Sequence, residues 1–426
     1  MTDVITVPVA PSKHEIIPIH ASDRGSFKAC RRKWDWSSPM RMNLTPKPEE
    51  HGIVMPLWFG SGIHWALKYY YDPMLQRDPV EVFKTWWYVQ MNGGFITEDW
   101  LETVLDRNPK SVDITPQAKN PEGQWDDAGL PVQGYEVKGL NYLLPTDMAA
   151  QQQEEFEMHY DLGVGMLKFY KEYAEKNDNF DVIAAEHTFS VPIYDFDNDC
   201  ELVAVDVRDG QTKPVHLRGT QDAIIQDRET GRFGILEHKT TARIDEDYFL
   251  KLDKDEQCTT YMFAGEVEAK VHGLPYTEID FVLYNALRKA FPRYPSLTGR
   301  GDISINRQTE STTYEMLVDA IESRGEMDWW LSNEKQRAYL EYVKEVGDEQ
   351  FVVRTNVRRN RHEIYSCGER VFLETRDMLN DPAIYPNPTG NYSCLRCVFR
   401  APCIAKDDGS EWQWMLDEQF EVNRNR

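Results

Sequence analysis

The stretch RGTQDAIIQDRETGRFGILEHKTT, residues 218–241, holds two short apolar runs on either side of the turn-forming hexapeptide DRETGR. Such a pattern predicts a β-hairpin. If Asp227 pairs with Arg232, the same register places Asp222 directly opposite Glu237. Opposed residues on neighbouring strands have Cβ atoms about 4.5–5.5 Å apart. The hairpin therefore predicts two carboxylates close enough to share one divalent cation.

A lysine is expected beside these carboxylates, because Lys239 lies two residues after the second one and side chains alternate along a strand. Mg²⁺ or Mn²⁺ held by carboxylates can polarise a phosphate and lower the pKa of a bound water. A lysine beside the metal can orient that water and neutralise developing charge. A surface hairpin with a cross-strand ion pair is the alternative. The apolar pairs Ile224–Ile225 and Ile235–Leu236 favour core strands, which rarely carry Asp, Glu and Lys.

These residues and their spacing resemble the PD-(D/E)XK nuclease superfamily, specifically its RecB-like branch. That branch often reads G-x-x-D on the first strand, E/D-x-K on the second and Q-x-x-x-Y on the next helix. The corresponding stretches here are Gly219-Thr-Gln-Asp222, Glu237-His-Lys239 and Gln257-Cys-Thr-Thr-Tyr261. The resemblance implies an α/β, restriction-endonuclease-like core with a mixed central sheet flanked by helices. It also implies one catalytic group of Asp222, Glu237, Lys239, Gln257 and Tyr261, with Asp222 and Glu237 as ligands of Mg²⁺ or Mn²⁺.

The same branch places a histidine on an early helix as a further metal ligand. FGSGIHWALKYYYD, residues 59–72, resembles that element, with His64 as the candidate ligand and a buried core histidine as the alternative. Glu186, on the strand before the hairpin, is a candidate for an accessory acidic position. His238 should point to the face opposite Glu237 and is interpreted as structural.

Three cysteines follow each other closely near the C-terminus, in Cys394-Leu-Arg-Cys397 and then Cys403. The two-residue spacing lets two thiolates bind one centre, and Cys30 is the best fourth ligand for a tetrahedral site. The layout resembles RecB-like nucleases with an iron–sulfur cluster, of the AddB and CRISPR-associated four-cysteine types. It implies a [4Fe–4S] cluster on Cys30, Cys394, Cys397 and Cys403 that joins helical N-terminal and C-terminal regions, with structural Zn²⁺ as the alternative. The other cysteines are predicted to be buried thiols: Cys200, Cys258 and Cys367.

Three basic stretches stand out from an acidic background. They contain Arg31 and Arg32; Arg288 and Lys289; and Arg354, Arg358 and Arg359. Each alone is typical of a solvated face. Together they could form a groove that follows DNA phosphates.

The overall charge limits how the chain could meet DNA. Its 426 residues carry a formal net charge of −23, which counts against nonspecific adhesion to nucleic acid. A local basic channel on an acidic body is still compatible with a DNA enzyme. No run of 18 apolar residues and no signal peptide are found, which predicts a cytoplasmic protein without a membrane partner, in the host cytoplasm if the gene is phage-encoded.

Hydrophobic patterning divides the chain into four predicted segments. Residues 1–72 hold an irregular lead-in to residue 21, one proposed cluster cysteine and a helix beginning near Gly62. Residues 73–180 form a helical or irregular insertion, with an amphipathic helix over 150–176. Residues 181–310 form the nuclease core of strands and one helical run, and residues 311–426 form a helical region with the other cysteines.

The sequence thus predicts a Mg²⁺- or Mn²⁺-dependent DNA exonuclease for recombination, repair or phage DNA processing. Two alternatives remain: a catalytically idle module on the same fold that binds DNA ends or serves as a scaffold, and an endonuclease. The expected partners are DNA ends or single strands, with a recombinase, annealing protein or helicase as a possible protein partner.

Overall fold

The computed structural model describes residues 15–47, 55–107, 114–117, 134–137, 153–206, 209–274, 276–307, 310–380, 382–387 and 392–423. The predictions for residues 1–14, and for most of the insertion between residues 108 and 152, lie outside the described residues. None of the helices that it describes is long and apolar enough to cross a membrane.

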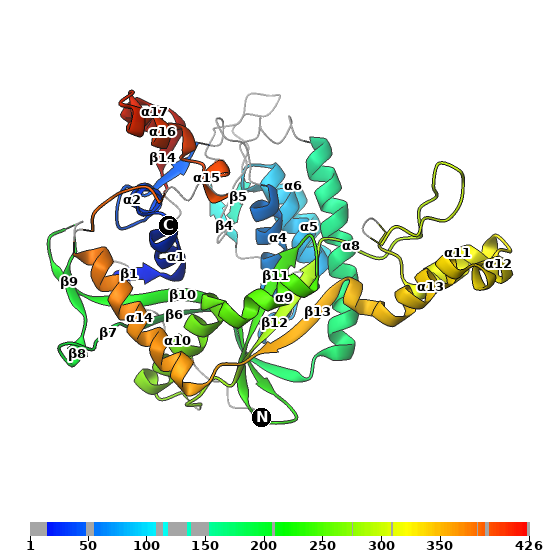
Figure 1. Cartoon of the computed structure of the whole chain (residues 1–426), viewed down its shortest axis with the longest axis horizontal. Helices are drawn as coiled ribbons and strands as arrows, with labels where there is room; N and C mark the ends of the chain where they lie inside the picture. The colour runs from blue at the N-terminus through cyan, green and yellow to red at the C-terminus, as the bar shows by residue number, and fades with distance from the viewer. Residues whose placement is uncertain are drawn as a thin grey trace.

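A seven-stranded mixed sheet forms the centre of the molecule (Figure 1). Its path runs β1-β10-β11-β12-β13, and two further strands, β6 and β9, pair with β10. The β10–β11 and β12–β13 pairs are antiparallel, whereas β11 and β12 are parallel. The mixed α/β fold is as predicted. The strands are β1 (Ile17–His20), β6 (Phe180–Pro192), β9 (Val203–Val205), β10 (Thr212–Asp227), β11 (Phe233–Thr241), β12 (Phe281–Arg288) and β13 (Val352–Val357).

The predicted hairpin is the β10–β11 pair, and its predicted register is confirmed. Ala223 lies opposite Leu236, and the pairing continues to the Asp227 N–H, which donates to the Arg232 carbonyl at 2.9 Å. The Asp227 carboxylate caps the turn by accepting the backbone N–H of Thr230. One step beyond Ala223 in the same register are Asp222 and Glu237.

Helices cover both faces of the sheet because its strands bury alternate residues on each side. Ala223, Ile225 and Leu236 pack with one group of helices, and Ile224 and Ile235 pack with the other. The first group is α4 (Met55–Tyr71), α5 (Pro79–Met91) and α8 (Gln153–Asn177). The second group is α10 (Glu256–His272) and α14 (Arg361–Leu379). The preceding α9 (Glu246–Leu250) and η1 (Lys251–Lys254) complete the predicted helical run after the hairpin.

Three local predictions need correction. The expected irregular lead-in contains β1, which pairs in parallel with β10 and buries Ile17 and Ile19. The helix expected near Gly62 begins at Met55, because its first turns bury Trp58 and Phe59. The insertion after residue 73 is more regular than expected. It contains α5, α6 (Glu98–Arg107), and the small sheet of β3 (Phe95–Thr97), β4 (Ile114–Gln117) and β5 (Gly134–Val137).

The N-terminal and C-terminal regions pack against each other. Strand β2 (Leu44–Pro46) pairs with β14 (Phe420–Val422), and the buried side chains of Trp36 and Phe399 lie together beneath this pair. Protein contacts therefore join the two regions directly. The helices here are α1 (Ala21–Ala29), α2 (Arg31–Ser37), α15 (Tyr392–Leu395), α16 (Arg400–Asp408) and α17 (Trp412–Gln419).

A helical arm leaves the sheet between β12 and β13 and projects to the right in Figure 1. It has its own small core around Leu317, Trp330 and Leu340. The arm lies in the predicted helical region of residues 311–426 and consists of α11 (Tyr314–Ser323), α12 (Met327–Ser332) and α13 (Glu334–Val346), followed by η2 (Gly347–Gln350). Two short strands, β7 (Tyr194–Asp195) and β8 (Cys200–Glu201), form a separate hairpin after β6.

Candidate active site

Asp222 lies at the middle of the sheet, where β10 is flanked by β6 and β11. One carboxylate oxygen, Oδ2, accepts the backbone N–H of His238 at 2.6 Å. The other, Oδ1, lies 3.2 Å from Nδ1 of His64. The side chain keeps 14% of its surface exposed, so Asp222 borders the solvent while both of its oxygens are held in place by these two contacts.

Glu237 lies across from Asp222 on β11 and is almost completely buried, with 2% of its side chain exposed. Its Oε1 accepts hydrogen bonds from the Lys239 ammonium and from Nε2 of Gln257, the latter at 3.0 Å. The second oxygen, Oε2, is buried and has no hydrogen-bond partner among the described residues. Since an unsatisfied buried acceptor is costly, this oxygen is a candidate for binding a group that the protein itself does not supply.

The two carboxylates titrate very differently because their partners differ. Burial would raise the pKa of Asp222, but the hydrogen bond and charge of His64, with the charge of Lys239, hold it well below its usual range. Burial and the charge of Asp222 raise the pKa of Glu237 to about 7. Although burial opposes it, the two carboxylates also raise the pKa of Lys239. Such strongly displaced, mutually coupled groups in one place are typical of functional sites.

The glutamine–tyrosine pair on α10 holds Glu237 from the side. Gln257 also donates to the Tyr261 hydroxyl at 2.8 Å, and that hydroxyl donates to the Thr220 carbonyl of β10 at 2.7 Å. The helix is thereby tied to both strands of the hairpin. Gly219 has a packing role in the same place, because a Cβ there would lie 2.6 Å from the Phe189 ring of β6.

His64 extends from α4 to Asp222 and leaves 29% of its side chain exposed. Burial lowers the pKa of His64, but the adjacent Asp222 carboxylate reverses this and the net shift is upward. The early helix thus brings an imidazole to the hairpin, in the place where the resemblance implied a ligand.

Glu186 brings a third carboxylate close to Asp222. The β6–β10 register pairs Gln221 with His187 and Ala223 with Ala185, which puts Glu186 beside Asp222. Its backbone has φ = +47°, a conformation that residues with a Cβ seldom adopt within a strand. Burial and the charge of Asp222 raise the pKa of Glu186 to about 7.

The donor types at this site suit a hard divalent cation, although their present positions do not enclose one. Among the residues that the structure describes, no three His, Cys, Asp or Glu side chains are grouped as ion ligands. Instead, the Lys239 ammonium contacts one oxygen of Glu237, and the His64 ring contacts one oxygen of Asp222. The carboxylates of Asp222 and Glu237, the latter with its unpartnered Oε2, and the imidazole of His64 nevertheless form a set of O and N donors that Mg²⁺ or Mn²⁺ can use.

A buried polar network lies behind the hairpin, and the sequence patterns did not predict it. The His238 ring does face away from Glu237, stacking on Tyr71 at a centroid distance of 5.4 Å. Burial lowers the pKa of His238 to about 3, so the ring is neutral. Its Nδ1 lies 2.8 Å from the amide of Asn285 on β12, and this amide also contacts Arg354 on β13. Arg354 in turn forms an ion pair with Asp178 at 2.6 Å.

The four cysteines of the proposed cluster belong to the N-terminal and C-terminal regions, and within the part of the chain that the structure describes no three of them are grouped as metal ligands. Cys30 lies between α1 and α2, Cys394 on α15, and Cys403 on α16. Burial raises the pKa of the Cys397 thiol, and the nearby Cys30 and Cys403 add to this shift. Cys394 is exposed, and no disulfide involves any of the four. Cys200 is exposed rather than buried, so that prediction is wrong, whereas Cys258 and Cys367 are buried as predicted.

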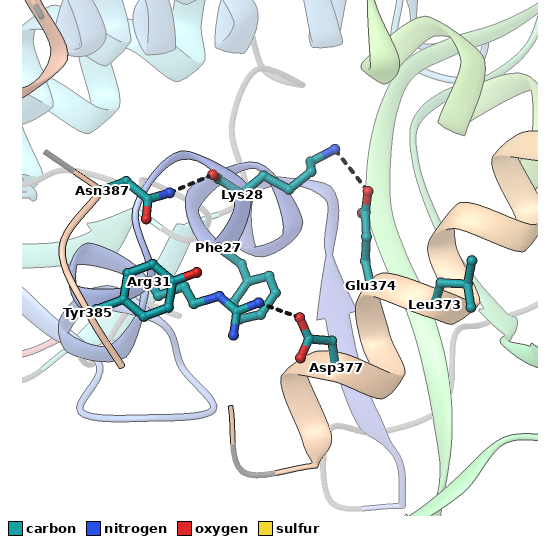
Figure 2. A pocket seen from close by; sticks show the side chains of 8 residues that line it. All are labelled: Phe27, Lys28, Arg31, Leu373, Glu374, Asp377, Tyr385 and Asn387. Carbon is teal, nitrogen blue, oxygen red and sulfur yellow. Dashed lines mark hydrogen bonds and ion pairs between the residues drawn. The ribbon is translucent and has the colours of Figure 1, made fainter. Parts of the chain in front are cut away.

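The basic residues around Cys30 mostly bind acidic residues of the C-terminal region. Arg32 pairs with Asp407 at 2.7 Å and also donates to the Cys403 sulfur. Figure 2 shows Arg31 directed at Asp377, an ion pair of 2.6 Å, in a pocket of about 340 Å³ between α1 and α14. These contacts indicate that the first basic stretch holds two regions of the protein together, which leaves less charge for DNA than expected.

The other basic stretches divide into buried and exposed members. Arg354 has only 10% of its side chain exposed and belongs to the buried network, so it does not fit the predicted DNA contact. Arg359 donates to the Leu252 carbonyl and the Thr259 hydroxyl, which anchors it at the start of α10. Arg358 is exposed, whereas Arg288 and Lys289 are partly buried, the latter over the Phe59 ring. Of this set Arg358 remains the side chain most open to a phosphate.

Comparison with known proteins identifies the family. A family model described as the PD-(D/E)XK nuclease superfamily matches residues 21–404. The match extends from α1 to α16 and therefore includes His64, the hairpin, the α10 pair and all four cysteines. A search of curated proteins found no match.

Proposed function

Because this chain belongs to the PD-(D/E)XK nuclease superfamily, we propose that it is a Mg²⁺- or Mn²⁺-dependent DNA exonuclease. The observation that carries the proposal is the convergence of Asp222, Glu237 and Lys239 on adjacent strands, with Gln257 and His64 directed at the two carboxylates. A catalytically idle DNA-binding module needs no such set of mutually perturbed groups. Recombination, repair or phage DNA processing is the proposed setting, with a recombinase, annealing protein or helicase as the proposed partner.

In this proposal Asp222, Glu237 and His64 would hold the divalent cation. The bound cation would supply Lewis-acid polarisation of the scissile phosphate and a water of lowered pKa. Lys239 carries a positive charge and is 31% exposed, so its ammonium can face the phosphate and stabilise charge that develops during attack. Gln257 and Tyr261 keep Glu237 oriented, which reduces the cost of assembling the site at each turnover.

Exonuclease action predicts a requirement for DNA ends. Linear duplex and single-stranded DNA should be degraded in Mg²⁺ or Mn²⁺, whereas covalently closed circles of the same sequence should survive. The assay compares both forms on gels, with the circle linearised by a restriction enzyme as the matched control. Cutting of closed circles at a rate similar to linear DNA would establish the endonuclease alternative instead.

We further propose that Cys30, Cys394, Cys397 and Cys403 hold a [4Fe–4S] cluster, with Zn²⁺ as the alternative. The support is that Cys30 and Cys403 lie near Cys397, although Cys30 is far from the other two in sequence, and that Arg32 donates to the Cys403 sulfur. Hydrogen bonds to cluster sulfurs are a common way in which proteins stabilise a cluster.

Anaerobically purified protein should therefore be brown, with a broad absorption band near about 400 nm and about four irons per chain. Cys397→Ser should remove most of this colour, whereas the control Cys200→Ser, at an exposed cysteine outside the proposed site, should keep it. A colourless protein with one zinc per chain would show that the cysteines bind Zn²⁺ instead of a cluster. A protein with neither metal would refute this part of the proposal.

A further inference from the structure

Asn285 is completely buried at the sheet position next to His238, because the parallel β11–β12 register pairs these two residues. Its amide nitrogen lies 2.8 Å from the His238 Nδ1 and donates to the Tyr170 hydroxyl at 2.8 Å. Its amide oxygen accepts from the Arg354 Nε at 3.1 Å. All of its polar atoms are therefore engaged, and one of them touches the residue between Glu237 and Lys239.

Arg354 determines which way this amide points. A guanidinium has only donors, so the amide oxygen must face Arg354 and the amide NH₂ must face the histidine. Arg354 cannot turn away, since it is also paired with Asp178 at 2.6 Å and donates to the Tyr170 hydroxyl at 3.1 Å. With an NH₂ group facing it, Nδ1 of His238 must be the acceptor. The ring proton is then on Nε2.

The His238 ring is consequently held on two sides, by the Asn285 amide at its Nδ1 and by the stacked Tyr71 ring on its face. A fixed ring fixes the backbone that bears it. The N–H of that same residue donates to Oδ2 of Asp222 at 2.6 Å. A chain of defined contacts thus runs from Arg354 through Asn285 and His238 to the Asp222 carboxylate.

We propose that Asn285, oriented by Arg354, is a positioning residue for the catalytic hairpin. It holds the His238 ring in one position and in the Nε2–H tautomer. The fixed side chain helps to keep the His238 backbone N–H directed at Asp222. The inference rests on the proposed nuclease function for its kinetic consequence only. The tautomer itself is a property of the metal-free protein and can be measured without any activity.

The first test is the tautomer, measured by ¹⁵N NMR of the histidine rings in the wild-type protein, with His238→Gln to assign the signal. The expected result is an unprotonated Nδ1 and a protonated Nε2 for His238. A proton on Nδ1 would overturn the proposal. Because this measurement uses the wild-type fold, it stands even where a substitution at Asn285 prevents folding.

The second test is Asn285→Asp, which keeps the shape of the side chain and its acceptor for Arg354 but loses the donors to His238 and to the Tyr170 hydroxyl. Contacts that orient the groups around a metal site commonly change metal affinity or activity about 10–100-fold. We expect kcat to fall within that range, with the KM for DNA changed less than about twofold. Mn²⁺ affinity, followed by titration without DNA, should weaken in parallel.

The matched control is Asn92→Asp, the same chemical change at an exposed asparagine at the end of α5. It removes the donor to the Tyr88 carbonyl (2.8 Å) and leaves the network around His238 untouched. Its kcat should stay close to wild type. Equal losses in both variants, or a normal kcat in Asn285→Asp, would overturn the positioning role. Wild-type protein without nuclease activity would refute the proposed function instead, and the tautomer and Mn²⁺ measurements would still decide this inference.

Discussion

Lys239→Met and Asp222→Asn are each expected to lower the rate of DNA cleavage by at least about 10³-fold, the upper end of what loss of one electrostatic group usually costs. Lys239→Met removes the one ammonium that contacts Glu237 among the described residues, and Asp222→Asn removes a carboxylate from the proposed metal site. Rates are measured on end-labelled linear DNA in Mg²⁺ and in Mn²⁺. The site residues should thus be essential for cleavage.

The same variants should keep the fold. Asp222→Asn loses the attraction to His64 and Lys239 that lowers the Asp222 pKa, but it also removes the repulsion that raises the pKa of Glu237, so the melting temperature should change little. Lys239→Met leaves Glu237 without its ammonium partner, but the pKa of this carboxyl is already raised to about 7, so it can take up a proton. Circular dichroism and thermal melts check this. Glu229→Gln, in the exposed turn of the same hairpin, is the matched control and should cleave like wild type. Activity in both site variants within about tenfold of wild type would contradict the proposed nuclease site.

Arg354→Met should be among the most destabilising single substitutions in the sheet region. It leaves Asp178 as a partly buried carboxylate without its cation and removes the donor to Asn285. Breaking a fully buried ion pair by removing one partner costs about 3–5 kcal/mol, and this pair, with 10% and 18% of its side chains exposed, should lie toward or below the lower end of that range. Burial already raises the pKa of Asp178 despite the opposing charge of Arg354, so the unpaired carboxylate would be strongly disfavoured. Urea denaturation followed by tryptophan fluorescence measures the loss.

Two further variants separate this effect from a general loss of charge. Arg358→Met, at an exposed arginine four residues further along, should leave the urea midpoint unchanged. The double variant Arg354→Met/Asp178→Asn should recover part of the lost stability, because it no longer contains the unpaired carboxylate. A midpoint for Arg354→Met equal to that of Arg358→Met would show that the ion pair contributes little.

The sequence predicted those parts of the fold that depend on local patterns. The hairpin follows from two apolar runs and a turn, and the register from Asp227 and Arg232 extended correctly to the residues beside Asp222. Strand β13 was missed, because VVRTNV carries an arginine and an asparagine that look solvent-facing. Arg354 is largely shielded from solvent because Asp178, far away in sequence, pairs with it at the end of α8. A pattern of neighbours in sequence cannot reveal such a pairing.

The same distinction holds at the site. Glu237, Lys239, Gln257 and Tyr261 are regularly spaced on one hairpin and one helix, so their proximity follows from geometry. Asn285 stands in the apolar run FVLYNAL, where one polar residue carries no signal until β12 is placed beside β11. Likewise, the arginines near Cys30 looked like a DNA surface until their acidic partners on α14 and α16 were known.

The pairing of β2 with β14 also has a consequence for biosynthesis. Its two strands are more than 370 residues apart, so the first is made long before its partner leaves the ribosome. At about 5–20 residues per second, the delay is roughly 20–75 s. During that time Leu44 and Trp36 lack the C-terminal side chains that cover them in the finished protein. The nascent chain thus exposes apolar surface until its C-terminal region is made, and the proposed metal site, which needs Cys30 together with the C-terminal cysteines, could be completed only at the end of translation.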